Sequence, residues 1–320
     1  MGKKNLKAQL NYAIQSCFKG NSRQSGGFGA SKHSDIVTGQ KNAKIYSWSS
    51  YHSRVDVACQ FAAYVRENHP EVREVRQLTP EMAEGFLLSK VGNCTTETLD
   101  CYRSNLASLG ENINRTYSTA HVDLKVGKVA GTTANQETRC KAMTDAHITA
   151  LRDSYRPGST GYTAVTLASI AGCRASEIVR LKTEHIEIKS SSLATVFIRG
   201  GKGNRDRTIQ IHDPQDVKQL ADIKASAAAG ERLVPTKVGS IQKSLNRHMA
   251  KLSGSSGNSM KSEYQHTGIH AIRKNFAQKE YDRHRENHTR QETLDYVSAQ
   301  LGHGAGRDLA TLQRYIANIY

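Results

Sequence analysis

Two segments decide the fold of this chain: HTGIHAIRKNFAQ at residues 266–278 and LGHGAGRDLATLQRY at residues 301–315. In the first segment His270 and Arg273 stand three residues apart on a predicted helix, and residues at this spacing share one helix face. Thr267 can cap that helix, and isoleucine and phenylalanine residues recur along its other side at helical spacing. The spacing predicts a polar pair that projects from a helix anchored by its apolar side.

The second segment supplies a histidine and a tyrosine. His303 follows a predicted short helix, and Tyr315 is expected on the next helix, where Leu309 and Leu312 would anchor it. A tyrosine hydroxyl can act as a nucleophile that forms a covalent intermediate, and an arginine offers a planar fork of donors to two phosphate oxygens. Histidines donate hydrogen bonds or move protons near neutral pH. Each residue alone would suit an ordinary helix surface, so the prediction depends on their order and on the residues upstream.

A helix boundary lies upstream in AGCRASEIVRLK, residues 171–182. The apolar run before it predicts a buried helix that ends at Gly172, and a new helix begins near Arg174. Arg174 is therefore expected at the first turn of a helix whose body is buried. Glu177 follows three residues later, and the two could form a surface ion pair of small energetic effect.

A β-hairpin is predicted in TVFIRGGKGNRDRTIQI, residues 195–211. Apolar residues alternate at both ends of this segment, and glycines lie between the two alternating runs. Lys202 stands in the predicted turn, where a flexible single charge can reach into a neighbouring site.

Taken in order, these positions resemble the signature of the tyrosine recombinases of the phage-integrase family, which is Arg…Lys…HxxR…LGH…Tyr. The matching positions are Arg174, Lys202, His270 with Arg273, His303 and Tyr315, and Glu177 matches an acidic residue that the family often carries. The resemblance covers roughly residues 140–315. Two departures are a long basic insert at residues 278–293 and a longer loop, GAGRD, after the LGH motif.

The resemblance implies a mainly α-helical fold with a small antiparallel β-sheet, in which a helical core-binding domain precedes a catalytic domain. Three helices predicted within residues 49–110, together with an amphipathic helix at residues 1–19, resemble the four-helix DNA-clasping domain of the family. The same pattern would also suit an ordinary small helical domain. The expected divisions are a basic N-terminal helix and flexible segment at 1–48, a core DNA-binding domain at 49–115, a linker at 116–136 and a catalytic domain at 137–320.

The resemblance also implies a reaction on double-stranded DNA. Tyr315 would attack phosphorus and become a 3′-phosphotyrosyl, while Arg174 and Arg273 would bind the non-bridging oxygens in place of metal ions. Lys202 would protonate the departing 5′ oxygen. No metal, cofactor or ATP is expected, because the phosphotyrosyl bond conserves the energy needed for rejoining.

Three further residues are assigned supporting roles by the same resemblance. His270 would assist proton transfer with Tyr315, and His303 would donate a hydrogen bond to a phosphate oxygen. Glu177 would orient Arg174 or His270 without itself contacting the phosphate. The implied assembly is a homotetramer on two recombination sites, and the implied role is the integration or excision of a phage or other mobile element.

Composition agrees with a DNA-binding protein and excludes some other classes. The 320 residues carry a formal net charge of +16, and 37% are hydrophobic, enough for buried cores at this length. The six cysteines include no CxxC pair and the thirteen histidines no metal-binding spacing, so neither a disulfide framework nor a metal site is predicted. No apolar run could span a bilayer, and the N-terminus lacks a signal peptide, so we expect a cytoplasmic protein that associates with the nucleoid when bound to DNA.

Two other functions remain open from the sequence. A type IB topoisomerase would use the same chemistry to relax supercoils without exchanging DNA partners, and a non-catalytic DNA-binding protein would share the charge and the fold. The modest length favours a recombinase over a topoisomerase. The complete set of arginine, lysine, histidine and tyrosine positions argues against a loss of catalysis.

Overall fold

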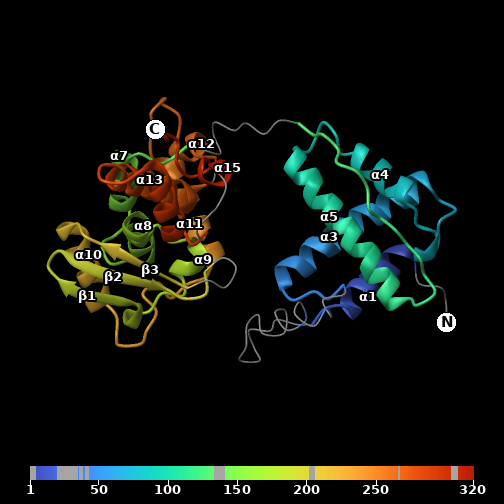
Figure 1. Cartoon of the computed structure of the whole chain (residues 1–320), viewed down its shortest axis with the longest axis horizontal. Helices are drawn as coiled ribbons and strands as arrows, with labels where there is room; N and C mark the ends of the chain where they lie inside the picture. Colours follow the sequence, from blue (N-terminus) through green and yellow to red (C-terminus); the bar gives the residue numbers. More distant parts are fainter. Residues whose placement is uncertain are drawn as a thin grey trace. The chain divides into compact units, whose positions relative to one another are not determined.

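The computed structural model describes residues 5–19, 35, 39, 43–132, 141–201, 206–265, 267–303 and 309–320. The chain divides into two compact units, Met1–Ala134 and Asn135–Tyr320, which are treated separately (Figure 1). Lys202 lies outside the described residues, as do most of the segment at 20–42, residues 133–136 of the predicted linker and residues 137–140 at the start of the predicted catalytic domain.

The regular elements in the described part of the first unit are all helices. Its helices are α1 (Leu6–Ser16), α3 (Trp48–Asn68), the short 3-10 helix η2 (Val75–Gln77), α4 (Pro80–Leu88) and α5 (Thr96–Thr116). The four α-helices begin after Asn5, Ser47, Thr79 and Thr95, whose side chains each accept a hydrogen bond from a backbone N–H in the first turn. Polar caps in the sequence therefore mark where these helices start.

Helix α1 belongs to the core of this unit. It packs against α3 and α5, and Leu10, Ala13 and Ile14 are fully buried. The division expected after residue 48 therefore does not separate the N-terminal helix from the helices that follow it. The apolar face of α1, which the sequence predicts, is covered by α3 and α5 and not by solvent, so this helix packs within the first unit.

The end of α5 was predicted wrongly. The segment TTETLDCYRSNLASLG predicts a helix that closes at Gly110, but the helix continues to Thr116 because Gly110 serves packing and not termination. A Cβ at this glycine would lie 3.3 Å from the backbone nitrogen of Leu124 and from the backbone oxygen of Val122. Val122 and Leu124 are buried in the core of the first unit, so this part of the predicted linker packs against α5.

The second unit combines helices with one small sheet. Its elements are α7 (Asp145–Asp153), α8 (Thr160–Ala171), α9 (Ala175–Ile178), the 3-10 helix η3 (Thr183–His185), β1 (Ile186–Ser190), β2 (Leu193–Ile198), β3 (Arg207–Ile211), α10 (Pro214–Ala225), α11 (Val238–Lys251), α12 (Met260–Glu263), α13 (Gly268–Arg285), α14 (Arg290–Gln300) and α15 (Leu309–Leu312). Helix α8 is almost entirely buried and packs against α7, α10, α11 and α13 (Figure 1). The site described below is built around the C-terminal end of this central helix.

The predicted hairpin is present. Strands β2 and β3 pair antiparallel, with Val196 opposite Ile209, and β1 extends the sheet in the order β1-β2-β3. The chain is therefore mainly α-helical with a small antiparallel sheet, as the sequence predicted. None of the helices in the described residues combines the length and the apolar character needed to cross a membrane.

The first helix of the second unit starts later than the sequence indicates. The sequence predicts a helix from about Glu137 to Asp153; residues 137–140 lie outside the described residues, and α7 begins at Asp145, where the Thr144 hydroxyl caps it. The basic insert at residues 278–293 is helical over most of its length, because α13 continues into it to Arg285 and α14 starts at Arg290. Thr289 caps α14 in a reciprocal arrangement with a glutamate three residues on, which explains the new start.

Replacing Gly172 with alanine is expected to lower the free energy of unfolding by about 2–5 kcal/mol. Gly172 ends α8 at φ +54°, a left-handed conformation that disfavours an L-residue by about 1–2 kcal/mol. A Cβ there would also overlap the ring of Phe276, and overpacking adds about 1–3 kcal/mol. Urea denaturation measures the change. Gly158→Ala is the matched control, because Gly158 is also left-handed at φ +76° but has nothing within 4 Å of the added carbon; equal losses in the two variants would contradict the overlap argument.

Candidate active site

Arg174 and Glu177 form a buried pair where α8 gives way to α9. Arg174 is the N-cap of α9, and its backbone N–H and its guanidinium each donate to one carboxylate oxygen of Glu177, both at 2.8 Å. The Glu177 side chain is only 1% exposed, whereas that of Arg174 is 17% exposed. The pair predicted from the sequence is therefore present, but it is not the solvated surface pair that was the alternative interpretation.

Arg207 is a member of this cluster that the sequence analysis missed. It is the first residue of β3, and two of its N–H groups donate to the two oxygens of Glu177 at 2.9 and 2.8 Å. The signal lay in RTIQI, where Arg207 has the same phase as Ile209 and Ile211 on the buried face of the strand. An arginine in a buried phase needs buried hydrogen-bond acceptors, and Glu177 supplies them together with the opposite charge.

The charge of Glu177 is held by its arginine neighbours. Burial raises the pKa of Glu177, but the hydrogen bonds and charge of Arg207, the backbone N–H of Arg174 and the charge of Arg273 outweigh it and lower the pKa to about 2. Glu177 is therefore ionised throughout the neutral and mildly acidic range.

Replacing Glu177 with glutamine is expected to flatten the acid limb of the stability curve. The folded-state pKa of Glu177, about 2, lies below the ordinary glutamate value of 4.5, so its contribution to stability is fully present above pH 4.5 and disappears as the pH falls through about 2. The shift corresponds to a free energy on the order of 3 kcal/mol. The check is the free energy of unfolding of both proteins between pH 5.5 and pH 2.5. A parallel pair of curves would show that Glu177 is not held ionised in the fold.

Arg273 is fully buried at the centre of the cluster. One of its terminal N–H groups donates to the carbonyl of Gly172 and another to the carbonyl of Leu301 at 2.5 Å, so the ends of α8 and α14 meet at this side chain. Arg174 also donates to the Leu301 carbonyl, at 3.1 Å. Burial, together with the charges of Arg174 and Arg207, lowers the pKa of Arg273 to about 10, which leaves it protonated at neutral pH.

Tyr315 lies against three of the predicted site residues. Its ring centre is 5.2 Å from that of His270, 5.1 Å from that of His303 and 5.6 Å from the guanidinium carbon of Arg273. His303 is 8% exposed, and its Nε2 lies 3.5 Å from a terminal nitrogen of Arg174. His270 and Arg273 from α13 and His303 from the turn after α14 thus meet at one tyrosine, and His303 connects them to Arg174.

The local structure at Tyr315 differs from the prediction. Helix α15 ends at Leu312, and Tyr315 lies in the following turn, where its backbone N–H donates to the Leu312 carbonyl at 2.8 Å. Leu312 and Ile316 are each 1% exposed and hold this turn in the core, whereas Leu309, which we expected as an anchor, is 40% exposed. A turn between two buried residues therefore fixes the tyrosine.

The segment after Tyr315 is bound to α13. The side-chain amide of Gln278 donates to the carbonyl of Asn318 and accepts from its N–H, both at 3.1 Å. The hydroxyl of Tyr320 donates to Asp282 at 3.3 Å, and its ring packs edge-on against Tyr281. Tyr320 is therefore occupied on α13, while Tyr315 is the tyrosine that lies between the two histidines.

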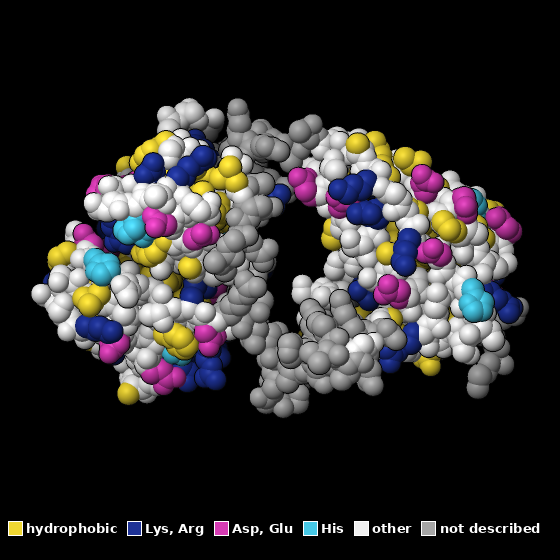
Figure 2. Space-filling view, in the orientation of Figure 1, with side chains coloured by type: hydrophobic (Ala, Val, Ile, Leu, Met, Phe, Trp, Pro, Cys, Tyr) yellow, Lys and Arg dark blue, Asp and Glu magenta, His cyan; other side chains and the backbone are white. Residues whose placement is uncertain are grey.

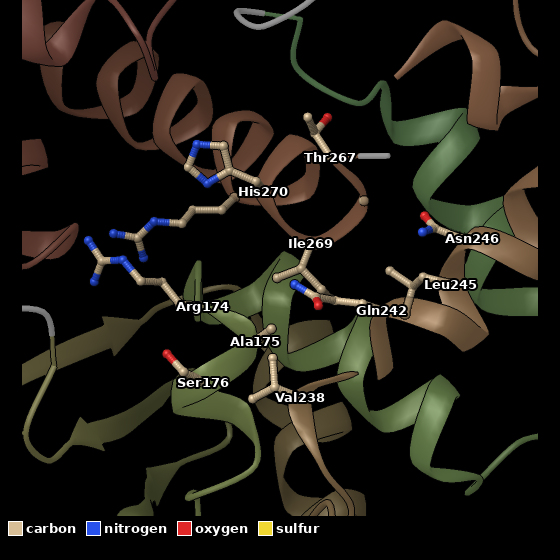
Figure 3. A pocket seen from close by; sticks show the side chains of 12 residues that line it. Arg174, Ala175, Ser176, Val238, Gln242, Leu245, Asn246, Thr267, Ile269 and His270 are labelled. Atoms are coloured by element: carbon tan, nitrogen blue, oxygen red, sulfur yellow. The ribbon is translucent and has the colours of Figure 1, made fainter. Parts of the chain in front are cut away.

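A pocket of about 310 Å³ opens beside these residues. Arg174 and His270 point toward the same end of it, and Gln242 and Asn246 line it from α11 (Figure 3).

The predicted cap of α13 is not formed, because the hydroxyl of Thr267 donates to the Tyr264 carbonyl at 2.6 Å and leaves the first turn uncapped by a side chain. The first turn of α13, including His270, borders the pocket.

The cluster carries excess positive charge. Arg174, Arg207 and Arg273 surround the single carboxylate of Glu177, and burial raises the pKa of the adjacent Cys173 thiol to about 12, which keeps it neutral. The buried Nε of Arg273 has no hydrogen-bond partner among the described residues. The arrangement therefore suits a bound anion next to a tyrosine hydroxyl. No group of three or more metal-binding side chains occurs in the part of the chain that the structure describes.

The sequence matches no protein-family profile and no curated protein. Solved structures are more informative. The XerH site-specific recombinase bound to palindromic difH substrate aligns at a TM-score of 0.61 and 15% identity, over 97% of this chain and 90% of that chain. A lambda integrase tetramer bound to a Holliday junction aligns at 0.56 and 11% identity, over 98% and 78%. The Tn1549 transposon integrase in complex with circular intermediate DNA aligns at 0.55 and 11% identity, over 98% and 95%. At these identities the similarity establishes a common fold.

Proposed function

We propose that this chain, which has the fold of the tyrosine recombinases, is a site-specific DNA recombinase. It cleaves and rejoins double-stranded DNA through a 3′-phosphotyrosyl intermediate, without metal or ATP. The observation that carries the proposal is the placement of Tyr315 against His270, His303 and Arg273, with Arg174 beside them. A nucleophile, proton carriers and anion-binding groups thus share one site.

The arginines account for binding and stabilising the phosphate. Cleavage of a phosphodiester develops negative charge on the non-bridging oxygens, and fixed cationic donors lower the barrier by binding that charge. Arg174 is partly exposed and Arg273 keeps an unpaired N–H, so both have donors to offer an oxygen. Glu177 and the carbonyls of Gly172 and Leu301 hold the two guanidinium groups in place before the DNA arrives.

The remaining side chains supply the nucleophile and move the protons. Tyr315 attacks phosphorus as its hydroxyl proton passes to His270, and the bond to the 5′ oxygen breaks. Lys202, on the connection between β2 and β3, protonates that oxygen, and His303 donates to a non-bridging oxygen. Attack by the free 5′-hydroxyl of another strand reverses these steps and releases Tyr315.

Charge supports DNA as the partner. The chain has 45 lysine and arginine residues against 29 aspartate and glutamate residues, and basic side chains occur on both units on the face seen in Figure 2. The biological role that fits best is integration or excision of a phage or other mobile element, performed by a homotetramer on two sites. The tetrameric lambda integrase on a Holliday junction and the transposon integrase on circular intermediate DNA share this fold, which supports the assembly and the role.

Affinity for duplex DNA is expected to fall steeply with salt. Each phosphate neutralised by a lysine or arginine releases counterions, so the logarithm of the binding constant changes with the logarithm of salt concentration at a slope of about −0.9 per phosphate. With six or more contacts, affinity should drop about 10³-fold or more between 50 and 200 mM salt. Fluorescence anisotropy over this range is the measurement. An affinity that stays flat would remove backbone contacts from the proposal.

The decisive experiment traps the covalent complex. Randomised duplexes are enriched for those that the protein retains, and the enriched sequence is rebuilt with a nick so that cleavage releases a short 5′-hydroxyl fragment. A covalent adduct should accumulate in EDTA without ATP. Supercoiled plasmids with and without the enriched site then separate the alternatives: a recombinase needs the site and exchanges partners, whereas a topoisomerase relaxes both plasmids. Retention of DNA with no adduct on any nicked duplex would identify a non-catalytic binding protein.

A further inference from the structure

Arg207 has no role in the chemistry described above, yet it is buried beside it. Its side chain is 6% exposed, and both terminal nitrogens donate to Glu177. A buried arginine–carboxylate pair is a costly way to stabilise a fold, because apolar residues of similar volume often do as well. Such a pair is better explained when the geometry it imposes is itself needed.

The surroundings of Arg207 fix its position from two further directions. A Cβ on Gly302 would lie 3.0 Å from a terminal nitrogen of Arg207 and 3.2 Å from its Cδ, so the glycine leaves room for this side chain. Gly302 adopts φ +67° and directly precedes His303. Arg207 therefore fills the space between Glu177 and the turn that carries His303.

Glu177 transmits this position to Arg174. Its two oxygens accept from Arg207 on one side and from the backbone and guanidinium of Arg174 on the other, so the carboxylate has one orientation that satisfies all four hydrogen bonds. Without Arg207 the carboxylate is free to rotate toward Arg174 and to hold that guanidinium more closely. Arg174 would then be less available to a phosphate oxygen.

We propose, on the basis of the function proposed above, that Arg207 is a positioning residue. It holds the Glu177 carboxylate in one orientation and so sets the direction in which Arg174 binds the scissile phosphate. Arg207 does not touch the DNA. Because Arg207 is the first residue of β3, its hydrogen bonds to Glu177 also connect this strand with the phosphate-binding arginines. The strand follows the segment that carries Lys202.

A double-mutant cycle tests the coupling. Arg207→Met, Glu177→Gln and the double variant are compared in the single-turnover rate of adduct formation at saturating nicked DNA. Arg207→Met is expected to slow the reaction about 10-fold or more, with DNA affinity within about 3-fold of the wild type. The double variant should be no slower than the slower single variant, because both changes act through one contact. Rate losses that multiply, or a loss of affinity that explains the rate, would overturn the proposal.

Stability measurements and a further variant guard against misfolding. In Arg207→Met the Glu177 carboxylate keeps Arg174 as its partner, whereas the double variant leaves the charges of Arg174 and Arg273 without a carboxylate, so urea denaturation of each variant sets a temperature at which all of them are folded for the rate comparison. Arg207→Lys keeps the charge but not the two-pronged geometry, and should recover stability more than it recovers rate. Equal recovery of both would indicate a purely structural arginine.

A readout independent of catalysis separates this inference from the function on which it rests. Glu177 is faced by Arg174 and Cys173 from the chain before α9, by Arg207 from β3 and by Arg273 from α13. The ¹³C resonance of the Glu177 carboxyl, assigned with Glu177→Gln, should titrate at a clearly higher pH in Arg207→Met than in the wild type. The same titration in both proteins would refute the positioning role of Arg207 even if cleavage occurs. A shifted titration with no adduct from the wild-type protein would instead refute the proposed function and leave the positioning role intact.

Discussion

Tyr315→Phe is expected to abolish the covalent protein–DNA adduct and to leave DNA affinity unchanged. The variant removes only the hydroxyl, so the ring contacts with His270, His303 and Arg273 are retained. Without the oxygen there is no nucleophile to attack phosphorus, and no bond to the protein can form. The loss should therefore be complete within detection, whereas the lysines and arginines that contact the backbone are untouched.

Tyr320→Phe is the matched control for this loss. Both tyrosines lie near the end of the chain, but the Tyr320 hydroxyl donates to Asp282 and its ring packs on Tyr281, away from the two histidines. Tyr320→Phe should keep the adduct. Peptide mapping of the trapped wild-type complex should place the 3′-phosphate on Tyr315. An adduct on Tyr320, or one that survives Tyr315→Phe, would overturn the assignment of the nucleophile.

The helix starts and the hairpin could be predicted because their signals are local. Threonine and serine caps mark the starts of most helices, a left-handed glycine ends α8, and alternating apolar residues define β2 and β3. The same logic placed His270 and Arg273 on one helix. It could not say that one of them would be exposed and the other wholly buried, because that depends on the ends of α8 and α14, which are distant in the sequence.

The features that were missed depend on tertiary contacts. Gly110 resembles a helix terminator, yet the backbone of residues 122–124 packs closely on it and the helix continues. The pattern LATLQRY is equally consistent with a helix or a turn at Tyr315, and the burial of Ile316 decides for a turn. Arg207 needed its partner, Glu177, which lies 30 residues away in the sequence and on another element. Local patterns carry no information about such partners.

Arg273→Ala is expected to damage both the chemistry and the fold, and Arg174→Ala the chemistry alone. Removing one fixed charge-stabilising donor costs roughly 3 kcal/mol in the transition state, or more than about 100-fold in the rate of adduct formation, for either arginine. Arg273 also satisfies the carbonyls of Gly172 and Leu301 in the core. Its loss removes this donor from the Gly172 carbonyl and leaves the Leu301 carbonyl with Arg174 alone, and should lower the free energy of unfolding by about 1–3 kcal/mol.

The two variants separate these contributions because Arg174 is partly exposed and shares the Leu301 carbonyl with Arg273. Single-turnover adduct formation at saturating DNA and urea denaturation are measured for both proteins at a temperature where both are folded. Rate losses of similar size with unequal stability losses are the expected result. If weaker DNA binding accounted for the whole loss of rate in Arg174→Ala, that arginine would be a backbone contact and not a stabiliser of the transition state. Equal stability losses would mean that the carbonyls at the ends of α8 and α14 find other donors when Arg273 is absent, and that its burial serves the phosphate alone.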